Sequence, residues 1–248
     1  MSSSRADELS GKVAIVTGGS RGIGHAIAGA FCTAGARVLI TGRNPDAGEE
    51  AAAALGTAAR FIAADQGDDE DWQRTIATAL SEFGRVDIFV SNAGISEPAP
   101  TPQMSLEKFR ETNRISLKGA FLGLQHCVRA MRLHGEGGSV ILISSIVGKV
   151  GVPGLIHYSA AKGGLRLMAK AAALELGPEK IRVNSIHPGM IRTDMTRGFD
   201  EAQMAALIPL GRFGEPNEVA DVALFLASLR GQFVTGAELI VDGGWVSQ

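Results

Sequence analysis

The chain lacks the features that mark secreted, membrane-spanning and metal-binding proteins. Its only two cysteines, Cys32 and Cys127, are far apart and have no local histidine partner, so neither a disulfide nor a metal site is predicted. No run reaches the roughly 18 apolar residues that a membrane helix needs. The most apolar stretch, Val140–Val147, is interrupted by Ser144 and Ser145.

The chain also has little net charge and few aromatic side chains. The 26 acidic and 24 basic residues leave a net charge of −2, and aromatic residues make up only 5% of the chain. Phosphate neutralisation and base stacking supply most of the affinity for nucleic acid, and both are weak here. We therefore expect neither nucleic acid nor membrane as a partner.

Length and composition favour one globular domain. The chain has 248 residues, of which 45% are hydrophobic and 20% charged, and α/β chains of this length often fold around one core. Residues 1–10 mix serine with charged residues and have no apolar region, so we expect a flexible tail and no targeting signal. The domain should then span residues 11–248, in the cytoplasm.

Short β-branched runs alternate with longer helical patterns. Runs such as VAIVT and VILIS are apolar at nearly every position, which is typical of strands covered on both faces. The predicted fold class is α/β, a Rossmann-type doubly wound sheet of seven parallel strands with helices on both faces. Ligands bind such a sheet beyond the carboxyl ends of its strands, where the strand order reverses. The expected strands are Val13–Thr17, Val38–Thr41, Arg60–Ala64, Val86–Ser91, Val140–Ile143, Val183–Ile186 and Leu239–Val241.

The first strand runs into a glycine-rich turn, TGGSRGIG, which precedes a helix over Ile23–Thr33. Gly18, Gly22 and Gly24 permit a sharp turn and the close approach of a pyrophosphate, which the positive end of the helix attracts. The spacing GxxxGxG differs from the general GxGxxG fingerprint, but the strand before it and the helix after it favour a dinucleotide site. Further cofactor contacts are expected from Ser20, Arg21 and Ile23.

The end of the second strand indicates which dinucleotide binds. An acidic side chain usually accepts from a free ribose 2′-hydroxyl at this point, but the chain has Gly42 followed by Arg43. A guanidinium suits a 2′-phosphate, and Arg21 lies within reach of the same group. The sequence therefore favours NADP(H) over NAD(H).

Polar residues follow the third and fourth strands at the same edge. Asp65 and Gln66 follow one, and Asn92, Ala93 and Gly94 follow the other. Asp65 is placed to accept from the adenine amino group. Asn92 either lines the cofactor cleft or ties together the ends of adjacent strands.

The fifth strand and the helix after it supply candidate catalytic groups. Ser145 follows the strand, and Tyr158 and Lys162 are four residues apart, so they share one face of the helix. A phenol titrates near 10, but an adjacent ammonium favours its phenolate. The pair is therefore suited to acid–base catalysis, with the serine hydroxyl orienting a carbonyl.

Six motifs, TGGSRGIG, SNAG, ISS, YSAAK, HPGMIRTDM and VDGG, resemble the short-chain dehydrogenase/reductase family in order and interval over residues 11–248. The resemblance implies that Tyr158 donates or accepts the proton and that Ser145 positions the substrate oxygen. Lys162 would hold the nicotinamide ribose and lower the pKa of the tyrosine. The resemblance also implies nicotinamide contacts from Pro188, Gly189, Ile191 and Thr193.

The chain departs from the family pattern at one catalytic position. The family usually has asparagine in a pattern like NLxGxF, where it holds a water of the proton relay, and SLKGAF places Ser116 there. Either Ser116 keeps the relay, or Asn113, one turn earlier, reaches the same place.

The substrate should be bound by three segments, Ser96–Gln103, Val147–His157 and Met195–Leu207. They include apolar residues such as Val150 and Val152 and no cluster of basic residues, so a small to medium hydrophobic ketone fits best. By resemblance to NADP-dependent secondary-alcohol dehydrogenases of the family, we expect a ketone reductase. His157 and His187 are expected to pack and not to bind substrate.

Two other functions stay open. The first is a 3-oxoacyl-acyl-carrier-protein reductase, for which Arg129 is favourably placed but Leu174 is not. The second is a cofactor-binding regulator without catalysis. The resemblance also implies a homotetramer that pairs through Leu106–Met131 and His157–Leu176, where the small residues Gly119, Gly123, Gly163 and Gly164 would permit close approach of a second subunit.

Overall fold

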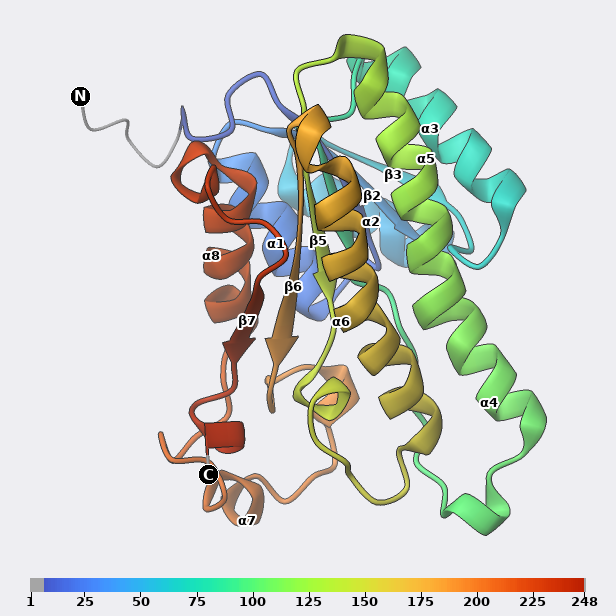
Figure 1. Cartoon of the computed structure of the whole chain (residues 1–248), viewed down its shortest axis with the longest axis vertical. Coiled ribbons are helices and arrows are strands. Elements are labelled where there is room, and N and C mark those ends of the chain that lie inside the picture. The colour runs from blue at the N-terminus through green and yellow to red at the C-terminus, as the bar shows by residue number, and fades with distance from the viewer. Residues whose placement is uncertain (1–6, 248) are drawn as a thin grey trace.

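The computed structural model describes residues 7–247 and contains one sheet of seven parallel strands. The strand order is β3-β2-β1-β4-β5-β6-β7, so the order reverses between β1 and β4 (Figure 1). This is the predicted doubly wound α/β architecture. The strands are β1 (Val13–Thr17), β2 (Arg37–Gly42), β3 (Ala59–Ala63), β4 (Ile88–Ser91), β5 (Gly138–Ile143), β6 (Ile181–Pro188) and β7 (Glu238–Val241).

The strand limits differ from the sequence prediction only at the ends. β1 has the predicted limits, whereas β6 is longer at both ends because its pairing with β5 begins at Ile181 and its pairing with β7 continues to Pro188. The apolar run of β1 is buried at every position, since helices cover both faces of the sheet.

Two helical layers enclose the sheet. The buried side chains of α1, α2 and α8 form one core with one face of the sheet, and those of α3, α5 and α6 form the second core with the other. In the view of Figure 1, α6 crosses in front of the strands and α1 and α8 lie toward the left. The helices are α1 (Gly22–Thr33), α2 (Pro45–Leu55), α3 (Asp69–Phe83), α4 (Leu106–Asn113), α5 (Gly119–His134), α6 (Ile156–Leu176), α7 (Glu201–Ala205) and α8 (Pro216–Ala227). Among the described residues, no helix combines the length and the apolar character needed to cross a membrane.

The long helix predicted over Leu106–Met131 is interrupted at its middle. A π-helical turn, Arg114–Lys118, separates α4 from α5 and buries Ile115 and Ser116. A π turn shifts the register of the helix by one residue, and such turns occur frequently at functional sites.

Three of the four glycines predicted to permit close approach of a second subunit pack against the chain itself, whereas Gly163 meets only the Gly148 carbonyl oxygen at an ordinary 3.7 Å. A Cβ on Gly119 would lie 2.8 Å from Gln66 Cγ, and one on Gly123 would lie 2.4 Å from Phe89. Gly164 meets Leu117 in the same way, at 2.8 Å.

The packed part of the chain begins earlier than residue 11. Of the predicted tail 1–10, residues 1–6 lie outside the described residues. Leu9 is buried in the core on the side of α1, and its amide donates to the carbonyl of Ala34 at 2.8 Å. The apolar side chain of Leu9 therefore anchors this end of the chain.

Candidate active site

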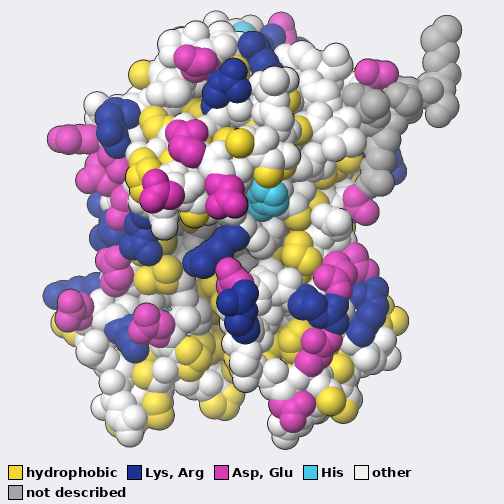
Figure 2. Space-filling model, turned by 180° about the vertical axis from the view of Figure 1, so that it is seen from behind, with side chains coloured by type: hydrophobic (Ala, Val, Ile, Leu, Met, Phe, Trp, Pro, Cys, Tyr) yellow, Lys and Arg dark blue, Asp and Glu magenta, His cyan; other side chains and the backbone are white. Residues whose placement is uncertain are grey.

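A cavity of about 530 Å³ opens at the carboxyl edge of the sheet, where β1 and β4 are neighbours and the strand order reverses. Viewed from behind, the lower half of the molecule is hollowed, and basic and acidic side chains surround the hollow (Figure 2). All the predicted site residues except Gly24 and Ser116 line the cavity. They are Gly18, Ser20, Arg21, Gly22, Ile23, Arg43, Asp65, Gln66, Asn92, Ala93, Gly94, Ser145, Tyr158, Lys162, Pro188, Gly189, Ile191 and Thr193.

The glycine turn joins β1 to α1 and depends on a left-handed residue, Gly18, and a close approach, at Gly24. Gly18 has φ of +64°, in the left-handed region that favours glycine. A Cβ on Gly24 would lie 2.3 Å from the carbonyl oxygen of Gly18, so Gly24 packs the helix against the turn and does not line the cavity. Asn92 adds a tether, because its Nδ2 donates to the carbonyl of Thr17 at 2.9 Å. Asn92 therefore both lines the cleft and ties β4 to β1.

Two arginines, Arg21 and Arg43, line the cavity in different settings. Arg43 is exposed, lines the cavity just after β2, and has no hydrogen bond or ion pair with the described residues. Arg21 pairs with Asp194 across the cavity mouth at 3.4 Å, with its side chain 77% exposed. The Arg43 guanidinium therefore has its donors available for an anionic ligand, while its positive charge lowers the pKa of nearby Asp65.

Asp65 and Gln66 differ sharply in their contacts. The Asp65 carboxylate accepts from Arg114 at 2.7 Å and from the Gly67 amide at 2.8 Å. Burial opposes ionisation of Asp65, but these hydrogen bonds and the positive charge of Arg114 lower its pKa. Gln66 is buried, and its amide contacts backbone carbonyls of the protein.

Three of the four predicted catalytic side chains, Ser145, Tyr158 and Lys162, line the cavity together. Ser145 follows β5, and hydrogen bonding from its hydroxyl lowers the pKa of Tyr158, which lies in the first turn of α6. The Lys162 ammonium lies one turn further along α6 and 5.4 Å from the centre of the Tyr158 ring. Lys162 also donates to the carbonyl of Ile143 at 2.7 Å. The distance of four residues on α6 thus places both groups toward the end of β5.

Burial governs the protonation of this group. It raises the pKa of Tyr158 to about 12, although the hydrogen bond with Ser145 lowers that pKa in part. It lowers the pKa of Lys162 to about 8. The resemblance implied a lowered tyrosine pKa, whereas burial raises the pKa of Tyr158 in this structure of the protein alone.

Ser116 lies close to the Lys162 ammonium, next to Gly94. A Cβ on Gly94 would be 3.3 Å from Ser116 Oγ and 3.5 Å from Lys162 Nζ, so both polar atoms approach Gly94 from the same side. Ser116 Oγ is buried and has no hydrogen-bond partner in the described structure. Asn113 does not take its place, since its Nδ2 donates to the carbonyl of Phe109 within α4.

Sequence reasoning missed two residues that organise the site. The Thr17 hydroxyl accepts from the amides of Asn92 at 3.0 Å and Ala93 at 3.1 Å, and its place at the end of a buried strand was the available signal. Ile115 lines the cavity, but helical periodicity gives no sign of the π turn that places it there.

Of the predicted substrate segments, a smaller part than expected borders this cavity. Ser96, Glu97, Met195 and Thr196 line it, whereas Val150 and Val152 do not. His187 is buried and contacts the carbonyl of Ser145 at 3.2 Å, and His157 is buried outside the lining, so neither histidine lines the cavity.

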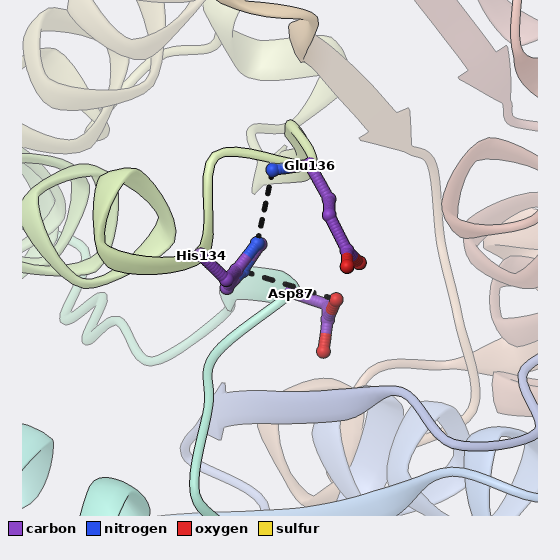
Figure 3. A group of neighbouring side chains, drawn as sticks. All are labelled: Asp87, His134 and Glu136. Carbon is purple, nitrogen blue, oxygen red and sulfur yellow. Dashed lines mark hydrogen bonds and ion pairs between the residues drawn. The ribbon is translucent and has the colours of Figure 1, made fainter.

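A second cluster lies at the opposite edge of the sheet. Asp87, His134 and Glu136 offer ligand atoms within 4.8 Å of one another (Figure 3). Asp87 already accepts from Arg85 at 2.6 Å and from the Val13 amide at 3.0 Å, and Glu136 also pairs with Arg85 at 2.5 Å. The guanidinium therefore occupies the place that a metal ion would need, and the cluster is an ion-pair network.

Comparison with known proteins places this arrangement in a family. The family model described as enoyl-(acyl carrier protein) reductase matches residues 18–246. The NADP-dependent (R)-specific alcohol dehydrogenase of Lentilactobacillus kefiri is 42% identical, and the match covers 98% of this chain and 99% of the relative. The chain belongs to the short-chain dehydrogenase/reductase family.

Other members of the family match over the whole chain. A short-chain type dehydrogenase/reductase from Mycobacterium marinum superposes with a TM-score of 0.94 at 36% identity, over 98% of both chains. A 3-oxoacyl-acyl-carrier-protein reductase from Chlamydia muridarum is 40% identical, over 95% of this chain and 98% of the relative. The short-chain dehydrogenase/reductase family uses nicotinamide cofactors, so oxidoreductase activity is supported.

Proposed function

We propose that the chain transfers a hydride between NADP(H) and a ketone or secondary alcohol, with Tyr158 as the acid or base. One observation carries the proposal: Ser145, Tyr158 and Lys162 line one end of a cavity whose other end is the glycine turn. The 42% identity to an NADP-dependent alcohol dehydrogenase supports the choice of both cofactor and substrate class.

The residues of the cavity fit a dinucleotide with a 2′-phosphate. The turn that lines the cavity begins and ends with a glycine, Gly18 and Gly22, so no side chain at these two positions keeps a ligand from the backbone. The amino terminus of α1 follows the turn. Gly42 stands where a carboxylate would accept from a 2′-hydroxyl, and Arg43 beside it makes no hydrogen bond or ion pair with residues 7–247. These features favour NADP(H) over NAD(H).

The bound nicotinamide would supply or accept the hydride. In reduction, the Ser145 hydroxyl donates to the substrate carbonyl oxygen, and the Tyr158 hydroxyl gives its proton to the same oxygen. With its pKa at about 12, Tyr158 stays protonated at neutral pH, as a proton donor must. The Lys162 ammonium stabilises the phenolate that forms.

Ser116 is proposed to take part in reprotonating Tyr158. Its orphan hydroxyl lies on the same side of Gly94 as the Lys162 ammonium, so one water between them would satisfy both groups. Ser116→Ala should lower kcat by about tenfold, less than Tyr158→Phe, because the hydroxyl acts one step away from the reacting atoms.

The substrate is proposed to be a small to medium hydrophobic ketone. Ile95 and Met195 supply apolar lining beyond the catalytic groups, and Met195 is half-exposed at the mouth. Glu97 lies two residues after Ile95 in the chain, and Lys108 pairs with it at 3.1 Å.

Initial rates of NADPH and NADH oxidation at about 340 nm with aryl ketones, cyclic ketones, a diketone and an acetoacetyl thioester test the proposal. Turnover of simple ketones with a preference for NADPH is expected, and Arg43→Ala should remove the preference. Binding of NADPH without turnover, together with no effect of Tyr158→Phe, would leave a cofactor-binding regulator.

A carrier-protein reductase is the second candidate, favoured by the 40% identical relative from Chlamydia muridarum. Such an enzyme docks an acidic carrier beside the site. Arg129 is exposed on α5, but the helix α6 presents Leu174, 85% exposed, where a basic residue would help. Activity confined to the thioester would decide for this candidate.

We also propose a homotetramer. Leu167 and Leu174 lie two turns apart on one face of α6 and are 61% and 85% exposed, which leaves an apolar stripe for a second copy. Light scattering after size-exclusion chromatography should give the tetramer mass, and Leu174→Glu should lower it. Elution of the wild type as a monomer would contradict the proposal.

A further inference from the structure

Gln66 is a buried residue whose contacts go beyond the predicted contact with the cofactor. It follows β3, is only 6% exposed, and its Nε2 donates to two backbone carbonyls, those of Ala93 and Ile115, both at 2.7 Å. Because both partners are acceptors, the nitrogen and not the oxygen of the amide must face them. One side chain thus joins three segments: the end of β3, the loop after β4 and the π turn.

The two carbonyls belong to residues that directly precede Gly94 and Ser116, which lie next to the Lys162 ammonium. Ala93 precedes Gly94, and Ile115 precedes Ser116. A Cβ added to Gly94 would lie 3.3 Å from Ser116 Oγ and 3.5 Å from Lys162 Nζ, so these two atoms lie on the same side of Gly94. The Gln66 amide therefore sets the separation between the two backbone segments that bring these groups together.

Gln66 is itself held firmly. Its backbone carbonyl accepts from Trp72 Nε1 at 2.8 Å. Its Cγ packs against Gly119, the first residue of α5, where an added Cβ would lie only 2.8 Å from it. On the far side of Ala93, the Thr17 hydroxyl accepts the Ala93 amide at 3.1 Å. Ala93 is thus fixed from β1 through its nitrogen and from β3 through its oxygen.

We propose that Gln66 is a positioning residue, whose amide fixes the π turn against the loop after β4 and so holds Ser116 beside Lys162 for proton transfer. This inference rests on the proposed function for its catalytic consequence. Its structural part, the tether between Ala93 and Ile115, stands independently of the reaction.

Gln66→Met is the central variant, because methionine keeps the length of the side chain and removes both donors. Amide hydrogen exchange across residues 93–94 and 115–119 should become about tenfold faster than in the wild type. In ketone reduction, kcat should fall by about 10- to 100-fold, as expected for a small displacement of catalytic groups, with the NADPH dissociation constant changed by less than about threefold.

Asn184→Leu is the matched control. Asn184 is also a buried amide with two backbone partners, Val234 at 2.9 Å and Ala237 at 3.0 Å, but it lies on β6 outside the cavity lining. It should lose stability as Gln66→Met does, while its kcat and the exchange at residues 115–119 stay as in the wild type.

Gln66→Glu gives a second test with a signature in pH. A protonated carboxyl donates one hydrogen to one carbonyl, whereas the ionised form donates none and repels both. Burial raises the pKa of such a carboxyl, so activity and protection of the π turn should both decline with rising pH where the wild type is unchanged.

Wild-type exchange rates and kcat in Gln66→Met, or losses equal to those in Asn184→Leu, would overturn the inference. If the wild type reduces no carbonyl compound, the proposed function fails, and the exchange measurements still decide whether Gln66 is the tether. If Gln66→Met does not fold, the pH dependence of Gln66→Glu decides.

Discussion

Removal of one proton from Lys162 should switch off ketone reduction above pH 8. The ammonium is buried with Ile143 as its acceptor, and burial lowers its pKa to about 8. About nine-tenths of the groups are then charged at a pH of about 7 and about one-tenth at a pH of about 9. Tyr158, with its pKa at about 12, stays protonated throughout and adds no break.

The rate of reduction should therefore fall about tenfold per pH unit above the pKa of Lys162. The assay is NADPH oxidation at saturating ketone and cofactor, at constant ionic strength from about pH 6 to about pH 10. Lys162→Arg is the control, because a guanidinium keeps its charge over this range, so any residual rate should show no break. A profile flat to the alkaline limit, or the same break in Lys162→Arg, would refute the assignment.

Two further predictions concern packing and charge away from the reacting atoms. Asp87→Asn should cost about 1–3 kcal/mol in urea unfolding. Burial opposes ionisation of Asp87, but Arg85 holds the pKa of Asp87 below its usual value. The stability that the ionised carboxylate contributes is therefore present above the usual pKa and is lost as the pH falls through the lowered pKa. An Asp87→Asn variant as stable as the wild type would contradict this. Gly24→Ala should cost about 1–3 kcal/mol and weaken NADPH binding in a fluorescence titration, because its Cβ would lie 2.3 Å from the Gly18 carbonyl oxygen. Gly29→Ala, also on α1, is the control, since its nearest contact is an ordinary 3.4 Å, and equal effects of the two changes would sink the argument.

The sheet and the place of the site could be predicted because both depend on local patterns. VAIVT is apolar at every position but the last and is buried throughout, and a glycine turn after such a strand has few other uses. The carboxyl ends of parallel strands share one edge, so Asn92 and Tyr158 had to lie near that turn although they are distant in sequence.

Contacts that depend on an irregular backbone could not be predicted. The period of 3.6 residues places Ser116 on a helix face but gives no sign of the π turn that buries it. Gln66 was expected to contact the cofactor because it follows a strand, and it does line the cavity, but nothing in the sequence indicates that the π turn provides its amide with two carbonyl partners. Side-chain geometry also decided the tyrosine pKa, since the sequence gives the neighbouring Lys162 but not the loss of water.

Lys162 shows why the carboxyl edge of the sheet, where the cavity lies, should be less stable than the amino edge, where Asp87 lies. Arg85 and Asp87 pair with each other, whereas Lys162 is buried beside a carbonyl and no carboxylate of the described residues pairs with it. Its pKa falls from 10.5 to about 8 on folding, so its charged form destabilises the folded protein fully below the lower value and not at all above the upper one. The size of this effect is roughly 3 kcal/mol at neutral pH, and the hydrogen bond to Ile143 that a substitution removes offsets part of it. Lys162→Met should therefore abolish activity and raise the free energy of unfolding by about 1–2 kcal/mol at about pH 7, with the gain shrinking as the pH rises toward the ordinary lysine pKa. Urea unfolding at neutral pH and near the ordinary lysine pKa measures this gain in the free energy of unfolding. A variant less stable than the wild type at neutral pH would show that the charge of Lys162 is compensated in the folded protein.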